Sequence, residues 1–70
     1  MSLLKVDWNT IERAIEKMLN DHMRTWGSYD YFIIDDVMIL VKVYAEGDNR
    51  LMFTIKAKWT DKGLEPVEVS

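Results

Sequence analysis

The side chains able to carry out acid–base chemistry are few, and His22 is the first of them. It is the only histidine in the chain, and imidazole is the side chain best suited to moving a proton near neutral pH. It shares helical spacing with Ile15 and Trp26, which predicts a half-buried position facing a core. Catalysis also needs an oriented partner and a pocket. We therefore expect His22 to be structural, hydrogen-bonded to a neighbour such as Asp30 or a tyrosine.

Carboxylates offer the next candidates, beginning with the adjacent Asp35 and Asp36. Paired-carboxylate catalysis needs two groups that converge on one bond, whereas neighbours in a turn solvate the backbone. The loop containing Glu46, Asp48 and Asn49 lacks the alternating ligands and closing Glu of a calcium loop. The chain has no cysteine, which removes thiolate metal sites. We expect no enzyme activity, no metal and no cofactor.

The elements that position these side chains are clearest between residues 37 and 59. Outside the loop at residues 47–49, odd-numbered positions there are apolar, and even-numbered positions carry most of the charge. A period of two predicts a hairpin with one buried face, in which Val43 lies opposite Phe53. The predicted loop is residues 47–49, where Asn49 suits the left-handed conformation that ends a three-residue loop.

An amphipathic helix is expected before this hairpin, from Trp8 to about Trp26. Apolar residues recur there at three- and four-residue steps. Asp7 and Asn9 both offer side chains that cap a helix start. Gly27 is the expected helix stop, because glycine tolerates the left-handed conformation common after a helix.

Residues 28–34 are predicted to form the first strand, because aromatic and β-branched residues dominate them. A two-residue turn at residues 35–36 would join this strand to the hairpin. In that register Phe32 faces the core, and Tyr31 and Ile33 lie on the outer face of the sheet.

A turn at residues 60–63, with glycine at its left-handed position, predicts a fourth strand over residues 64–70. Pro66 cannot donate to a strand ladder, so this strand should lie at an edge. The predicted fold class is α+β: one N-terminal amphipathic helix packed on a four-stranded antiparallel β-meander, in two layers. We expect a single domain over residues 1–70.

Composition limits the functional classes further. A hydrophobic share of 49% argues against disorder, and a formal net charge of −3 argues against a polycation that binds nucleic acid. The longest apolar run, residues 37–41, is too short to cross a membrane, and no signal peptide is expected at the start. The lack of cysteine fits a cytoplasmic location.

The outer face of the predicted sheet carries more large apolar side chains than a solvated face should, and such a set is typical of a buried interface. The predicted interface residues are Tyr31, Ile33, Met38, Leu40, Tyr44 and Met52. We expect a small non-catalytic protein-interaction module that forms a homodimer or docks on another protein through this face. If the first strand is shifted in register, part of this set belongs to the core instead.

Two other functions remain open. A single-strand nucleic-acid binder would stack bases on Tyr31 and Tyr44, with Lys42, Arg50, Lys56 and Lys58 holding phosphates. The acidic net charge and an expected pairing of Lys56 with Glu68 disfavour it. A small acidic inhibitor, covering a nucleic-acid-binding protein, would use a negative helix face. That face would consist of Asp7, Glu12, Glu16 and Asp21.

Overall fold

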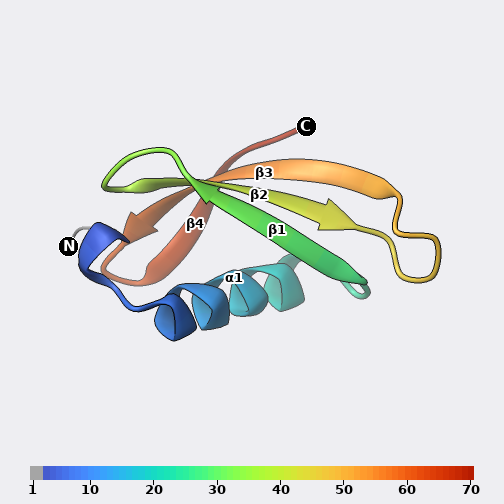
Figure 1. Cartoon of the computed structure of the whole chain (residues 1–70), viewed down its shortest axis with the longest axis horizontal. Coiled ribbons are helices and arrows are strands. Elements are labelled where there is room, and N and C mark those ends of the chain that lie inside the picture. The colour runs from blue at the N-terminus through green and yellow to red at the C-terminus, as the bar shows by residue number, and fades with distance from the viewer. Residues whose placement is uncertain (1–2) are drawn as a thin grey trace.

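The computed structural model describes residues 3–70 of the chain. A short 3-10 helix η1 (Leu3–Lys5) and the helix α1 (Trp8–His22) precede strands β1 (Ser28–Ile33), β2 (Met38–Tyr44), β3 (Leu51–Thr60) and β4 (Gly63–Val69). The four strands form one antiparallel sheet in the order β1-β2-β3-β4. Helix α1 lies along one face of this sheet (Figure 1). The predicted α+β fold, one helix followed by a meander, is confirmed.

Helix α1 begins where its capping residues predict. The Asp7 side chain accepts a hydrogen bond from the Thr10 N–H at 2.7 Å, which satisfies one of the backbone donors left free at a helix start. The same bond lowers the pKa of the Asp7 carboxyl. The buried face of α1 consists of Ile11, Ile15, Met18 and Leu19.

The end of α1 comes earlier than predicted, at His22 rather than near Trp26. Met23 is extended, with φ −140° and ψ 150°, and the chain crosses from there to β1. Trp26 therefore lies outside the helix. Its Nε1 donates a hydrogen bond to Asn20 Oδ1 at 3.0 Å, and its ring packs edge-on against Tyr29, with the ring centroids 5.6 Å apart. His22 is exposed at the helix end, so its predicted half-buried place is wrong.

Gly27 does not stop the helix but lets two backbones approach closely. Its N–H donates to Tyr44 O at 2.9 Å. A Cβ atom at this position would lie 2.7 Å from both Ala45 O and Glu46 Cα, so no larger residue fits without movement. Glycine is therefore required where β1 starts beside the end of β2.

The central β2–β3 hairpin forms as predicted over most of its length. Val43 lies opposite Phe53, and Asn49 takes a left-handed conformation with φ 55°. A bulge after Val43 places Leu51 opposite Tyr44. Leu51 is consequently an outward position, 48% exposed, rather than part of the buried face.

Strand β1 is displaced by one residue from its predicted register. Tyr31 pairs with Val41, and Ile33 pairs with Ile39. Both partners are fully buried, and Tyr31 and Ile33 pack against the same core. The predicted position of Tyr31 and Ile33 on the outer face is therefore wrong.

The connection between β1 and β2 explains this displacement. Asp35 Oδ1 accepts hydrogen bonds from the N–H groups of Val37 and Met38, each at 2.9 Å. Ile34 N–H also donates to Met38 O at 2.9 Å. This aspartate-stabilised turn is longer than the two residues predicted, and it turns Phe32 and Ile34 to the outer face.

Strand β4 lies at the edge opposite to β1, as Pro66 predicted. Gly63 has φ 109°, the left-handed conformation expected in the preceding turn, and Lys56 lies opposite Glu68. A register shift between Lys56 and Ala57 brings Pro66 opposite Ala57.

The core lies between α1 and the face of the sheet that it covers. Its buried residues are Leu3, Ile11, Ile15, Met18, Leu19, Ile39, Val41, Val43, Ile55 and Ala57. The apolar stripe of α1 and the odd-numbered positions of β2 and β3 supply most of them. The helical spacing and the two-residue alternation of the sequence predicted this. Within residues 3–70, no helix is both long and apolar enough to cross a membrane.

Candidate functional site

The face of the sheet turned away from α1 carries a set of apolar side chains, which we call the open-face patch. It consists of Phe32, Ile34, Met38, Leu40, Tyr44, Leu51 and Met52. Phe32 is 53% exposed, Ile34 50%, Leu51 48% and Met52 41%, and the other members are half-buried. The open face of an antiparallel sheet is normally polar, so this patch is the first candidate for a binding surface.

Most of the predicted interface residues lie in this patch: Met38, Leu40, Tyr44 and Met52. Tyr31 and Ile33 face α1 instead, and the sequence analysis did not include Phe32, Ile34 and Leu51. The sequence did contain a signal for the correct register. Ser28, Asp30 and Phe32 occupy alternate positions of one strand, so the face that carries the polar Ser28 and Asp30, and therefore Phe32, is the solvent-facing one. An interface role for the patch remains a prediction.

One polar row crosses the patch: Asp30 on β1, Lys42 on β2 and Thr54 on β3 lie opposite one another, between Leu40 and Tyr44. Lys42 Nζ lies 5.5 Å from the centroid of the Phe32 ring, a cation–π distance. The lysines of β3 lie opposite acidic residues of β4. These cross-strand pairs are Lys56 with Glu68 and Lys58 with Glu65. The basic side chains therefore have acidic neighbours on the same face, and the polar row separates a larger apolar group around Leu40 from a smaller one around Tyr44.

A second cluster lies on the other face, where the side of α1 meets β1. We call it the aromatic–acidic strip, and it consists of Trp8, Tyr31, Tyr29, Trp26, Glu12 and Glu16. Tyr31 Oη donates to Glu12 Oε2, and Tyr29 Oη donates to Glu16 Oε2, each at 3.0 Å. Centroids of the two tyrosine rings are 6.2 Å apart. These contacts fix α1 to the first strand.

The strip predicts how the protein responds to alkali. Burial and the Glu12 hydrogen bond raise the pKa of Tyr31 to about 12, and burial with Glu16 raises that of Tyr29 further. Burial and Asp30 also raise the pKa of Tyr44. A phenol with a raised folded-state pKa stabilises the fold fully below its ordinary pKa near 10, and this stability is lost as pH rises through the folded value.

We therefore expect little phenolate absorbance at pH 10, followed by cooperative unfolding as the pH approaches about 12. Phenolate absorbance and far-UV circular dichroism, titrated together, measure both events. The urea-unfolded chain, with ordinary tyrosines, is the control. Ordinary titration near pH 10 with the fold intact would contradict the geometry of the strip.

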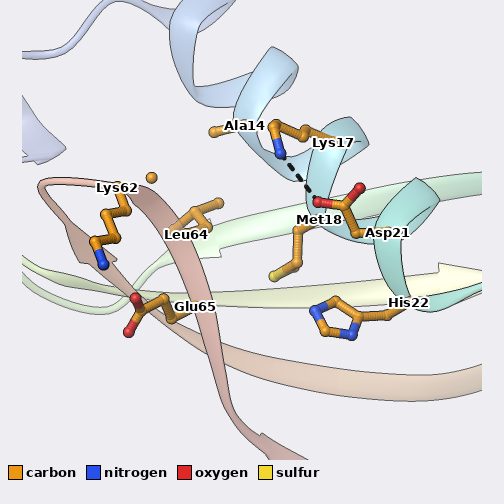
Figure 2. Close-up of a pocket in the computed structure, with 9 residues that line it drawn as sticks. Ala14, Lys17, Met18, Asp21, His22, Lys62, Leu64 and Glu65 are labelled. Atoms are coloured by element: carbon orange, nitrogen blue, oxygen red, sulfur yellow. Dashed lines mark hydrogen bonds and ion pairs between the residues drawn. The ribbon is translucent and has the colours of Figure 1, made fainter.

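Two grooves flank the end of α1, and His22 lines both. One is about 160 Å³ in volume, between α1 and the start of β4 (Figure 2). The other, about 240 Å³, is mostly apolar and includes Phe53 and Val69. Small-molecule sites usually measure about 300–1,000 Å³. Neither groove reaches that size.

The groove beside β4 contains charges but no convergent arrangement of them. Figure 2 shows Lys17 paired with Asp21 along the helix, at 3.1 Å. Lys62 and Glu65 come from the opposite wall. The ion pair is largely exposed, and such pairs contribute little. In the described part of the chain, no three His, Asp or Glu side chains gather to hold a metal ion.

Comparisons of this chain with protein-family models, with curated proteins and with solved structures find no match. A function must therefore be inferred from the surfaces of the molecule itself. The open-face patch is the largest departure from an ordinary solvated surface, and the aromatic–acidic strip is the second.

Proposed function

We propose that the protein is a small non-catalytic module that binds protein through the open-face patch, most simply a second copy of itself. The observation that carries this proposal is the exposure of Phe32, Ile34 and Met52 beside half-buried Leu40 and Tyr44 on one uncovered sheet face. Large apolar side chains that gather on one exposed face of a folded protein mark a binding surface. The absence of cysteine supports a cytoplasmic location as part of the same proposal.

Burial of this face provides enough apolar area to matter. A contact over the patch removes about 500–800 Å² per chain, the lower to middle range for specific dimers. At roughly 25 cal/mol/Å², the gross gain is about 12–20 kcal/mol per chain before the costs of association and ordering. A symmetric dimer places the same patch on both partners. Lysine stems at the rim can cover apolar surface while their charges stay in water.

The geometry gives less support to a single-strand nucleic-acid binder. Tyr31 and Tyr44 lie on opposite faces of the sheet, so they do not make one stacking platform. Tyr31 Oη is also held by Glu12. On the open face, Lys56 and Lys58 have acidic residues opposite them. These carboxylates reduce the positive electrostatic potential that would attract phosphate groups.

The acidic-inhibitor alternative is weakened in the same way. Its four proposed carboxylates do not share one surface: Glu12 and Glu16 turn toward β1, whereas Asp21 pairs with Lys17 at the groove beside β4. Asp7 is engaged as the helix cap. A protein that covers a basic partner would need these charges together.

The test compares two variants that add the same negative charge. Leu40 lies between Phe32 on β1 and Lys56 on β3, near the middle of the patch, and Thr25 is exposed in the connection after α1. At micromolar concentration we expect a dimer for the wild type and for Thr25→Glu, and a folded monomer for Leu40→Glu. Light scattering behind a sizing column gives the masses, and circular dichroism confirms folding.

The outcomes are distinct. A wild-type monomer at high concentration would contradict self-association. A Leu40→Glu variant that unfolds outright would show that Leu40 belongs to the core rather than to a binding face. Monomers from both Leu40→Glu and Thr25→Glu would point to net charge rather than the patch.

A further inference from the structure

The two edges of the sheet differ in how well they are protected against pairing with another strand. The β4 edge carries Glu65, Pro66 and Glu68, beside the register shift in the β3–β4 pairing. Proline, charge and bulges are devices that keep an edge from adding a strand. The β1 edge, residues 28–33, contains no proline and no lysine, and Asp30 is its only charged residue.

Strand β1 directs unpaired backbone groups toward solvent. Ile34 N–H donates to Met38 O, so the even-numbered residues of this segment turn their backbone groups to β2. In an antiparallel ladder the alternate residues then point away. Tyr29, Tyr31 and Ile33 therefore present N–H and C=O groups along the free edge.

Side chains on each side of this edge differ in chemistry. On the α1 side, Tyr29 and Tyr31 lie below the carboxylates of Glu16 and Glu12. The Trp8 ring, 61% exposed, lies beside Tyr31 with the ring centroids 5.9 Å apart, so it enlarges the aromatic surface on this side. These rings and carboxylates favour a cationic side chain. The open-face side of the edge carries the exposed apolar residues Phe32 and Ile34.

We propose that the β1 edge is a strand-addition site for an extended peptide of another protein whose residues alternate between basic and apolar. Its basic side chains lie against the aromatic–acidic strip, and its apolar side chains extend the open-face patch. Main-chain hydrogen bonds to Tyr29, Tyr31 and Ile33 supply affinity, and the alternation supplies specificity. A second copy of this chain is disfavoured as the added strand. Pairing two β1 edges would bring Glu12 and Glu16 of both chains close together, and these like charges would repel.

The test uses a short labelled peptide of alternating lysine and valine, added to the folded full chain. We expect saturable binding by fluorescence anisotropy, and slower amide exchange at Tyr29, Tyr31 and Ile33 by NMR. A peptide of the same composition with its lysines in one block and its valines in another should bind at least tenfold more weakly. Equal binding of the two peptides would overturn the proposal, since only charge would then be recognised.

Backbone methylation makes the test specific for strand addition. One probe is N-methylated at every lysine and another at every valine, so that each blocks hydrogen bonding along one edge of the peptide. We expect one of these probes to bind and the other to fail, because a strand uses alternate residues to pair. Loss of binding in both or in neither would overturn strand addition.

The acidic side chains are tested separately. The double variant Glu12→Gln, Glu16→Gln keeps acceptors for both tyrosine hydroxyls and should weaken the alternating peptide about threefold to tenfold. The matched double variant Glu65→Gln, Glu68→Gln, at the far edge, should not. An equal effect of both variants, or amides of Tyr29, Tyr31 and Ile33 already protected without peptide, would overturn the proposal. Leu40 lies opposite Phe32 in the open-face patch, so Leu40→Glu is not a neutral control for peptide binding. Slower amide exchange at Tyr29, Tyr31 and Ile33 on adding the peptide reports on the β1 edge whether the protein is a monomer or a dimer, so this site stands or fails independently of the open-face dimer.

Discussion

Ile15→Ala is expected to lower the free energy of unfolding by about 2–5 kcal/mol, the range for removing a buried aliphatic side chain and leaving a cavity. Ile15 is 0% exposed and lies midway along α1, over the sheet. A core of this size supplies only about 3–5 kcal/mol in total. The variant should therefore be largely unfolded at 25 °C, as measured by urea denaturation monitored by circular dichroism.

Arg13→Ala is the matched control, because Arg13 lies on the same helix and is exposed. We expect it to stay within about 0.5 kcal/mol of the wild type. Both variants must be compared at one protein concentration, since dimerisation would add to the measured stability. A loss below about 1 kcal/mol for Ile15→Ala would mean that α1 is not docked on the sheet as described.

Gly27→Ala should have the second largest effect, although the change adds only one methyl group. Its Cβ would lie 2.7 Å from the backbone of Ala45 and Glu46, and backbone atoms cannot move aside as a flexible side chain can. Relief requires the start of β1 to leave the end of β2, with loss of the hydrogen bond to Tyr44 O. We expect a cost of about 1–3 kcal/mol, measured by thermal unfolding.

Ser28→Ala serves as the control, since it changes the next residue and Ser28 is exposed. Its melting temperature should stay within a few degrees of the wild type, whereas each kcal/mol lost by Gly27→Ala lowers the melting temperature by roughly 4–8 °C in a domain of this size. Equal effects of the two variants would contradict the close approach at Gly27.

The features that the sequence predicted well are those in which one physical demand dominates. The β2–β3 hairpin has a buried face that alternates without exception through Ile39, Val41 and Val43, so a register shift would bury lysines. Asp7 has one suitable role before an apolar stripe, and it caps α1. Asn49 occupies a position where few other residues tolerate a positive φ.

The features that it predicted badly are those decided by tertiary contacts. In β1 both faces carry large apolar residues, so periodicity left the choice between Tyr31 and Phe32 open. The register was set instead by the side-chain bonds of Asp35 to the following turn. The end of α1 depended on where the chain had to cross to β1, and the apolar Met23 and Trp26 continued the helical pattern without continuing the helix.

This displacement of β1 changes which residues should make the proposed interface, and it leaves the proposed interface on the same face of the sheet. Phe32 and Ile34 replace Tyr31 and Ile33 on the open face, and the new pair is also apolar. It also brings both tyrosines of β1 under the carboxylates of α1. The aromatic–acidic strip follows from that register and from the early end of α1, so sequence periodicity alone did not predict it.

The most direct test of the open-face interface is an isotope-filtered NOE experiment on an equal mixture of labelled and unlabelled chains. It detects contacts between copies and assigns them to residues. We predict intermolecular contacts from Leu40, Met38 and Phe32, and none from the α1 residues Arg13 and Lys17. Intermolecular contacts confined to α1 or to the β4 edge, or no such contacts at concentrations where the protein is dimeric by light scattering, would contradict a binding role for the open-face patch.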